Sequence, residues 1–389
     1  MDQLRAQTRI SDAAIRWVMD RLRTEHSEFE VETGVADRWE LRLYYGSLSA
    51  ALEGDSMLIR VSAVDETCLS YMKMTVAGHV AQHLGTTSGL RWQGDGSDTG
   101  TPIFFREITV VSSTRISPHM QRLRFAGDDL GRFTHGGLHI RLLLPPRGRP
   151  PVWPSMGADG LLVWPAGEDA LTVRIYTIRA VDPISGWLDV DFVLHPDHDT
   201  PAATFAQNAV AGDVIGMIGP SGGETPTAPT LLLVGDDTAL PAIGRILGEL
   251  RPSTRVEALI EVDGPDDRIA LAQGDNIEIT WLYRHDRAAG TAGLLAAALR
   301  ERSHMALADN LYVWAGCEFT DFREIRKIVR KEWGLGRDRH LVTAYWRRDA
   351  QAEGDDGAEQ PIPSPRALPA ARCSGRQAGR SGNAPTGAP

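Results

Sequence analysis

The spacing of hydrophobic positions changes along the chain, and the first change sets off residues 1–95. The run SDAAIRWVMDRLRTEH predicts an amphipathic helix capped by Ser11 or Asp12, because its apolar residues recur on one face. Two alternating runs, WELRLYYG and DSMLIRVSA, predict strands, and TCLSYMKMTVAGHVAQHLG predicts a second helix that ends at Gly85. These elements indicate a small α+β domain, followed by a polar, glycine-rich linker in GLRWQGDGSDTGTP.

Between residues 103 and 224 the alternation of strands dominates and helical periodicity is nearly absent. Turn residues separate six runs, which are FREITVVSSTRIS, MQRLRFAGDDL, LHIRLLLPP, LTVRIYTIRAV, WLDVDFVLH and DVIGMIGPSG. A succession of short strands with little helix between them predicts an antiparallel six-stranded β-barrel.

Residues 228–347 alternate apolar strands with helices. The stretch TLLLVGDDTALPAIGRILGEL contains a strand, a tight turn and a helix; RVEALIEV, IEITWLYR, LYVWAGCEF and LVTAYWRR predict further strands, with helices over 288–302 and through Lys331. Strands that are apolar on both faces and alternate with helices predict a doubly wound α/β parallel sheet. Residues 348–389 contain almost no large apolar side chain, so we expect a disordered C-terminal tail.

Composition excludes several classes of protein. The 389 residues carry a formal net charge of −10, which argues against nucleic-acid binding. The chain has no run of eighteen apolar residues and its first residues lack the apolar core of a signal peptide, so we expect a cytoplasmic protein without stable membrane insertion. The three cysteines, Cys68, Cys317 and Cys373, are widely spaced, which excludes a disulfide framework and disfavours structural zinc.

The strand VRIYTIRAV carries polar residues that a barrel wall does not require. Arg174 and Tyr176 project to the same side of a strand, roughly 6–7 Å apart. There a guanidinium can pair with a pyrophosphate, a phenol ring can lie against an isoalloxazine ring, and Thr177 can offer a hydrogen bond near the flavin N5. The alternative is an ordinary half-exposed strand, which the short pattern alone does not exclude.

Five elements in this order resemble the siderophore-interacting protein family, the FAD-dependent ferric-siderophore reductases of the ferredoxin-reductase-like superfamily. They are RIYTIR, DFVLH with the following PA, AGDVIGMIGPSG, LLVGDDTALPAIGRIL and AYWRR, and together they cover about residues 103–347. The resemblance implies an FAD-binding barrel over 103–224 and an NAD(P)H-binding domain over 228–347.

The resemblance also implies which residues hold the FAD. These are Arg174, Tyr176, Thr177, His195, Pro201, Ala202 and Ala203, the last three at a helix start whose free N–H groups suit a pyrophosphate. Thr200 stands where the family usually has glycine, so the backbone approaches a phosphate less easily there. For His195, a strand-end histidine bonded to a neighbouring carbonyl is the alternative.

The turn GDDTALPA follows a buried strand and opens a helix, so its amides and the Thr238 hydroxyl can hold a nicotinamide nucleotide, or can merely start the helix. WAGCEF ends another apolar strand at the carboxyl edge, where such sheets bind ligands. Cys317 can line the hydride-transfer site or simply be a small buried residue. The residues predicted for NAD(P)H are Gly235, Asp236, Asp237, Thr238, Ala239, Pro241, Gly316, Cys317 and Glu318.

By resemblance, the chain reduces ferric siderophores with electrons from NAD(P)H and releases Fe(II), which hard oxygen ligands hold weakly. The family's three basic substrate residues correspond by position to Arg141, Arg179 and Arg284, although each alone can be a solvated arginine. Arg284 with Arg287 can instead bind the 2′-phosphate of NADPH, whereas Glu261 favours NADH. Ferredoxin as electron donor, a general NAD(P)H:flavin reductase and a non-catalytic siderophore-binding protein are alternatives.

The N-terminal unit resembles a small domain of unknown function that is found fused to this family. HVAQH places His79 and His83 one helical turn apart, which is the spacing of two metal ligands. Because the glutamate of HExxH and an obvious third ligand are missing, we expect no metal site. A further hypothesis makes this unit a module that binds a partner or iron.

Overall fold

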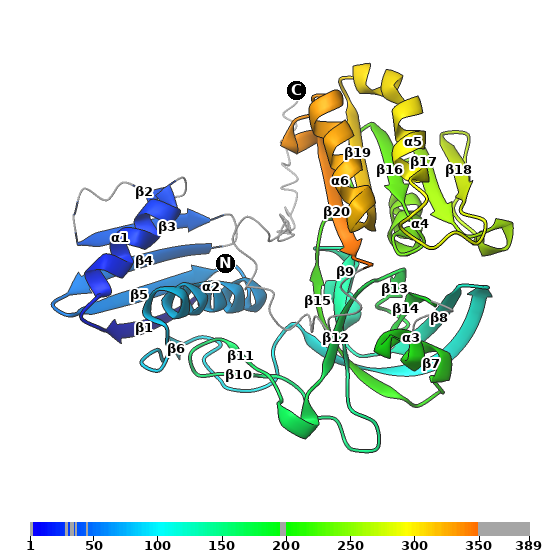
Figure 1. The fold of residues 1–389 in the computed structure, drawn as a ribbon. Coiled ribbons are helices and arrows are strands. Elements are labelled where there is room, and N and C mark those ends of the chain that lie inside the picture. The colour runs from blue at the N-terminus through cyan, green and yellow to red at the C-terminus, as the bar shows by residue number, and fades with distance from the viewer. Residues whose placement is uncertain are drawn as a thin grey trace, which may run out of the picture.

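The fold has three successive units, which correspond to the three regions of the sequence that differ in hydrophobic pattern (Figure 1). The computed structural model describes residues 3–27, 30–31, 35, 37–43, 46–194 and 200–348, with only the backbone of 30–31. The tail expected over 348–389 lies, except for Arg348, outside the described residues. Among the described residues, no helix is both long enough and apolar enough to cross a membrane.

The N-terminal unit is a six-stranded antiparallel sheet with both helices on one face (Figure 1). The buried face of the first helix is the predicted one, and the second helix ends at Gly85 in the left-handed conformation. The pattern of the sequence did not reveal the opening strand, in which Ala6, Thr8 and Ile10 point inward. The elements are β1 (Leu4–Ser11), α1 (Ile15–Glu25), β2 (Glu30–Val31), β3 (Arg38–Leu43), β4 (Gly46–Glu53), β5 (Ser56–Ala63), α2 (Glu66–Leu84) and β6 (Gln93–Gly94), in the sheet order β2-β3-β4-β5-β1-β6.

The stretch expected to be a linker belongs in part to this unit. Leu90 and Trp92 are buried in its core, and β6 pairs with β1 at the sheet edge. The expectation of a linker was wrong here because two large apolar residues, standing alone among glycines and polar residues, are enough to fix the segment.

The N-terminal unit packs directly on the barrel. Tyr71 and Met74 of α2 join Phe104 and Phe105 in one hydrophobic cluster, where the Tyr71 and Phe104 rings are stacked 5.8 Å apart. The loop that carries β10 (Ser155–Met156) and β11 (Leu162–Val163) reaches the same unit, since the Trp92 indole N–H donates to the Asp159 carbonyl at 2.9 Å. The two units therefore share buried apolar surface.

The barrel contains the six predicted runs, but one of them divides between two strands. The run 171–181 gives both β12 and β13, which lie at opposite ends of the sheet order β12-β9-β15-β7-β8-β14-β13. The elements are β7 (Phe105–Ser117), β8 (Met120–Ala126), the 3₁₀ turn η2 (Leu130–Thr134), β9 (His139–Leu144), β12 (Thr172–Thr177), β13 (Ala180–Asp182), β14 (Trp187–Val193), α3 (Pro201–Asn208) and β15 (Val214–Ser221).

The third unit is the predicted parallel sheet, in the order β18-β17-β16-β19-β20. α4 packs with one face in a cluster that includes barrel residues, and α5 and α6 cover the other face. The helix expected from residue 288 begins later because Gly290 and Gly293 have positive φ. The elements are β16 (Thr230–Gly235), α4 (Leu240–Glu249), β17 (Arg255–Val262), β18 (Ile277–Tyr283), α5 (Leu294–Glu301), β19 (Leu311–Glu318), α6 (Phe319–Lys327), a π turn (Ile328–Glu332) and β20 (His340–Trp346).

Polar contacts join the barrel to the α/β unit at several points. Arg245 of α4, only 5% exposed, donates to the Ile178 carbonyl at 3.3 Å and to the Thr134 carbonyl at 3.4 Å. At the turn between β7 and β8, the His119 backbone N–H donates to the Asp267 carboxylate at 3.1 Å. The units are therefore held in one orientation by buried charge as well as by apolar contact.

The substitution Phe104→Ala tests the contact between the N-terminal unit and the barrel. Removing a buried phenylalanine costs about 3–5 kcal/mol, and here the loss falls on the shared cluster. We expect the N-terminal unit to become sensitive to proteases and to unfold at lower urea concentration than the rest. Ile184→Ala, at a side chain that is 96% exposed, is the control; equal urea midpoints for the two variants would contradict a shared core.

Candidate functional site

The strand from Thr172 to Asp182 changes its partner at its centre. The Ile178 N–H donates to the Leu138 carbonyl on the β9 side, and the next N–H, of Arg179, donates to the Asp189 carbonyl of β14, both at 2.9 Å. Before Ile178, β12 (Thr172–Thr177) pairs only with β9. The barrel wall between β12 and β14 therefore has no ladder of hydrogen bonds among the described strands.

Arg174 and Tyr176 share one side of β12, as predicted, and this is the side that faces the barrel interior. Tyr176 packs on the barrel core with its ring 4.4 Å from that of Phe192 on β14, and Phe205 of α3 adjoins Phe192. Burial raises the pKa of the Tyr176 phenol above its usual value. The Arg174 guanidinium donates to its neighbouring Val173 carbonyl at 2.8 Å. Tyr176 therefore presents an aromatic surface where the wall is open.

The helix α3 lies beside this opening and packs on β8 and β14. The Thr200 side chain caps it by accepting the Ala203 N–H at 3.3 Å, and Pro201 has no N–H. Among the described contacts of this first turn, the N–H of Ala202 remains for a ligand. Thr200 thus occupies the Ala203 N–H, which a glycine at this position would leave free. The predicted FAD residue His195 lies outside the described residues.

Two glycines face each other where the order of the parallel sheet reverses. Gly235 ends β16 and is the register partner of Gly316 on β19. A side chain on Gly316 would collide with the Tyr345 ring at 2.8 Å, and one on Gly235 would meet Ala239 at 2.6 Å. Ligands bind in such sheets at this reversal, at the carboxyl ends of the strands. The absence of side chains lets the Tyr345 ring lie against Gly316 and Ala239 lie against Gly235.

Tyr345 joins this carboxyl end of the sheet at Gly235 and Gly316, called the crevice below, to the barrel. Its hydroxyl lies 2.6 Å from His139 Nε2 on β9, and Thr177 is the register partner of His139 on β12. Burial, reinforced by the positive charge of Arg245, lowers the pKa of His139 to about 4, so the imidazole is neutral. His139 and Arg245 were not predicted, because only the fold brings them beside Thr177.

The Asp236 carboxylate ties together the ends of three strands. One oxygen accepts the Glu318 N–H at 3.0 Å and the Trp346 indole N–H at 2.9 Å. The other accepts the Thr238 N–H at 3.0 Å and its hydroxyl. The Ala239 N–H donates to the Asp236 carbonyl, so the amides at 238 and 239 and the Thr238 hydroxyl, predicted to hold the nucleotide, are occupied within the turn.

A buried charge cluster lies beside the same crevice. Arg284, 5% exposed, binds Asp237 at 2.8 Å and lies 3.7 Å from Glu261 and 4.0 Å from Asp263. Both Glu261 carboxyl oxygens lack a hydrogen bond among the described residues. Burial raises the pKa of Glu261 to about 8 despite Arg284, so this acid is neutral at pH 7.

Cys317 is fully buried, and its side chain belongs to the cluster between the sheet and the helices α5 and α6. Burial raises the pKa of its thiol well above the usual range. This placement favours the packing alternative for Cys317 over a contact with nicotinamide.

The three arginines predicted for the substrate have three different surroundings. Arg141 lies on the outer side of β9 near Tyr71 of the N-terminal unit. Arg179 lies 4.0 Å from Asp191 and beside Gly244 of α4, and its Nε has no hydrogen-bond partner within the described ranges. Arg284 is bound by the carboxylates described above. Among the described residues, no contact is common to these three guanidinium groups, so they do not form one cluster.

A cleft of about 180 Å³ opens between the two units beside Arg245. The loop 134–138, Thr225 and the two acids Glu224 and Glu249 line its remaining walls. With acids on this wall the cleft does not suit an anionic ligand.

The residues of the barrel wall and of α3 fit FAD. FAD has an aromatic platform in Tyr176, a guanidinium in Arg174 and a helix start at Ala202, grouped around an unpaired stretch of barrel wall. The paired glycines lie at the reversal of the sheet order, where such sheets bind ligands.

Comparisons with known proteins agree with this geometry. The model of the siderophore-interacting FAD-binding domain matches residues 109–224, and that of the siderophore-interacting protein matches residues 228–349. A siderophore utilization protein from T. fusca is 32% identical with a TM-score of 0.52, over 64% of this chain and 97% of its own. The chain belongs to the siderophore-interacting protein family.

Other similar proteins extend the comparison. The ferric vibriobactin reductase ViuB of Vibrio cholerae is 28% identical over 255 residues, which are 64% of this chain and 92% of that protein. An uncharacterized protein of Mycobacterium tuberculosis is 30% identical over 271 residues, 65% of this chain and 93% of its own. The siderophore-interacting protein SipS from Aeromonas hydrophila is 27% identical with a TM-score of 0.53, over 64% of this chain and 95% of its own.

Glu261→Gln tests the neutral state of the buried acid. A raised pKa in the folded state stabilises the fold below the ordinary pKa, and this contribution is lost as the pH rises through about 8. We expect the free energy of unfolding of the unaltered chain, relative to Glu261→Gln, to fall by roughly 2 kcal/mol or more between pH 5 and pH 9. Urea titrations measure it, with Glu278→Gln at an exposed site as the control; a difference that does not change with pH would contradict the assignment.

Proposed function

We propose that this member of the siderophore-interacting protein family is an FAD-dependent ferric-siderophore reductase that takes its electrons from NAD(P)H and works in the cytoplasm. The names of the ferric vibriobactin reductase and of the ferric acinetobactin reductase of Acinetobacter baumannii, which is 27% identical over 203 residues, support this activity. The observation that carries the proposal is the proximity of Thr177, on the flavin strand, to His139 and Tyr345 at the nicotinamide crevice.

The chain's own residues bind and orient both cofactors. Arg174 and the Ala202 N–H bind the FAD pyrophosphate, Tyr176 covers the flavin ring, and Thr177 lies at its reactive edge. Bound FAD supplies the step from the two-electron chemistry of nicotinamide to the one-electron chemistry of iron. Gly235 and Gly316 admit the nicotinamide, and Asp236, Asp237 and Glu318 lie beside them at the ends of β16 and β19.

Tyr345 controls access between the two cofactors in this proposal. Its ring covers Gly316, so the nicotinamide reaches the flavin side only if the ring moves. The hydrogen bond to His139 holds the ring in its present place, and neutral His139 makes this bond without adding a positive charge beside the flavin. The ring therefore keeps water from the crevice until the dinucleotide binds.

The substrate is an anionic ferric chelate, so its binding site needs a cation. Arg179 is partly exposed and lies where β12 becomes β13, while its Nε is buried 4.0 Å from Asp191, and it is the strongest of the three predicted arginines. Arg141 follows. Arg284 is the weakest, because a guanidinium already bound to buried carboxylates has little charge left for a ligand.

The decisive experiment mixes the purified yellow protein with NADH or NADPH under anaerobic conditions and then with ferric catecholate and ferric hydroxamate chelates. We expect rapid bleaching of the flavin and reoxidation by at least one chelate. Bleaching without faster reoxidation by any chelate would indicate a general flavin reductase. No bleaching by either dinucleotide would indicate ferredoxin as donor if reduced ferredoxin bleaches the flavin, and a binding protein if it does not.

Arg174→Ala tests the flavin site directly. Loss of a charge-assisted hydrogen bond to a pyrophosphate costs about 1.5–3 kcal/mol, which raises the Kd for FAD by roughly 10- to 100-fold. Flavin fluorescence quenching measures the Kd, and Arg147→Ala, at an exposed loop position, is the matched control. Equal Kd values for the two variants would place the pyrophosphate elsewhere.

A further inference from the structure

The N-terminal unit brings three histidines and a glutamate together at the end of α1 and on α2. The Nε2 atoms of His26 and His79 lie 3.0 Å apart, and His83 Nε2 lies 3.3 Å from the Glu25 carboxylate. One potential ligand atom from each of Glu25, His26 and His79 lies within 4.8 Å of the other two. The third ligand that HVAQH lacks in sequence is therefore supplied by α1, which ends beside α2.

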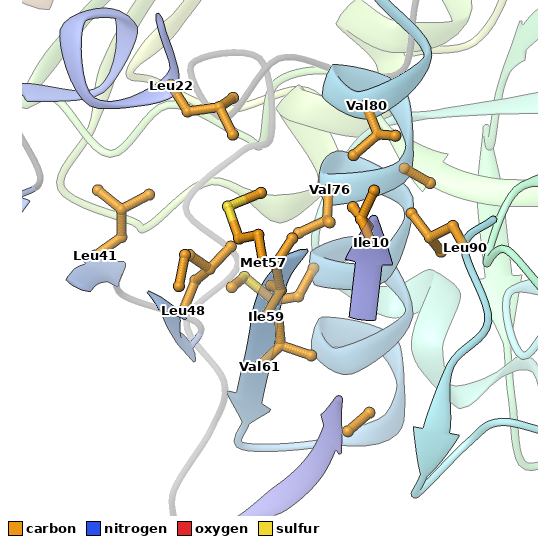
Figure 2. Close-up of a cluster of buried hydrophobic side chains, with 14 of the residues drawn as sticks. Ile10, Leu22, Leu41, Leu48, Met57, Ile59, Val61, Val76, Val80 and Leu90 are labelled. Carbon is orange, nitrogen blue, oxygen red and sulfur yellow. The ribbon is translucent and has the colours of Figure 1, made fainter. Parts of the chain in front are cut away.

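His26 and His79 also border a cavity of about 40 Å³ in the core of this unit. Its other walls are largely apolar, and Leu22, Leu41, Leu48 and Met57, among the labelled side chains of Figure 2, belong to them. Trp39 also lines the cavity and is 2% exposed, and its indole N–H has no partner among the described residues. A cavity of this size has room for a water molecule, and two imidazoles and the Trp39 ring are among the groups that line it.

The spacing of the nitrogens fits a common ion. Two nitrogens that bind one ion at 2.0–2.1 Å, at angles between octahedral and tetrahedral, lie about 2.9–3.4 Å apart. An imidazole ring binds a metal ion through the lone pair of a nitrogen that carries no proton. Two imidazoles and one carboxylate suit divalent iron or zinc and leave positions open for water.

We propose that the N-terminal unit binds one divalent first-row transition-metal ion through His26, His79 and the Glu25 carboxylate. His83, whose ring packs edge-on against Trp17 at 5.6 Å, orients that carboxylate from outside the ligand set. We further infer that the ion is Fe(II) received from the neighbouring reductase, and this second part rests on the proposed function.

Metal binding itself is measured on the full chain after treatment with a chelator. Calorimetry with Zn(II), and anaerobic titration with Co(II) followed by its visible d–d absorption, report stoichiometry and coordination. We expect one ion per chain, and we expect His26→Ala and His79→Gln each to weaken Co(II) binding at least tenfold. Glu25→Gln should change the Co(II) spectrum as well as the affinity.

His304→Ala, at an exposed histidine of the α/β unit, is the matched control and should bind like the unaltered chain. Circular dichroism and Tm show whether each variant folds. If His26→Ala does not fold, His79→Gln, which keeps a polar side chain, still tests the site. No saturable binding in the unaltered chain, or equal affinity in His79→Gln and His304→Ala, would overturn the site and leave a hydrogen-bonded histidine pair.

The inference that the bound ion is Fe(II) has its own test. After one anaerobic turnover on a ferric chelate, a colorimetric Fe(II) chelator should trap iron more slowly in the unaltered chain than in His79→Gln, with equal rates of flavin bleaching. Equal trapping rates would overturn Fe(II) as the cargo. If bleaching fails while Co(II) still binds, the reductase proposal falls and the metal site stands.

Discussion

The exchange of partners between Ile178 and Arg179 is the constraint on which the cofactor site depends. One continuous strand bonds to β9 up to this point and to β14 after it. Hydrogen bonds therefore close the wall between this strand and β14 at residues 180–182 and leave it open at residues 172–177. The opening leaves Tyr176 and Arg174 accessible beside α3. Arg245 of the α/β unit donates to the Ile178 carbonyl, at the point of exchange. The flavin strand and the orientation of the two units are thus fixed by the same few atoms.

Charge is distributed unevenly around the crevice of the α/β unit, and hydrogen bonds decide where it is tolerated. Asp236 is buried, and the donors of Thr238, Glu318 and Trp346 offset part of the cost of its charge, although burial and Asp237 still raise its pKa. Glu261 has no such donors and is neutral instead, so Arg284 is left mainly to Asp237. The crevice consequently carries less negative charge than its sequence suggests, which suits the approach of a dinucleotide that is itself anionic.

Local pattern predicted most of the fold, because alternation and helical periodicity record which side of an element is buried. It predicted Arg174 and Tyr176 on one side of a strand, since that depends only on a period of two. It did not predict His139, Arg245 or His26, whose partners lie far away in the sequence and carry no local signal. It also misjudged Leu90 and Trp92, because two isolated apolar residues produce no periodicity although they complete a core.

The helix α2 links the N-terminal unit to the barrel wall in a way that bears on how iron would pass between them. Tyr71 and Met74 pack against the barrel, whereas His79 lies eight residues beyond Tyr71, about 12 Å along a helix axis. Met72, Val76 and Val80 hold the intervening turns in the core. Because one buried helix carries both contacts, the histidine cluster keeps a fixed position relative to the barrel, and an ion released at the flavin would reach it by diffusion rather than by movement of the unit.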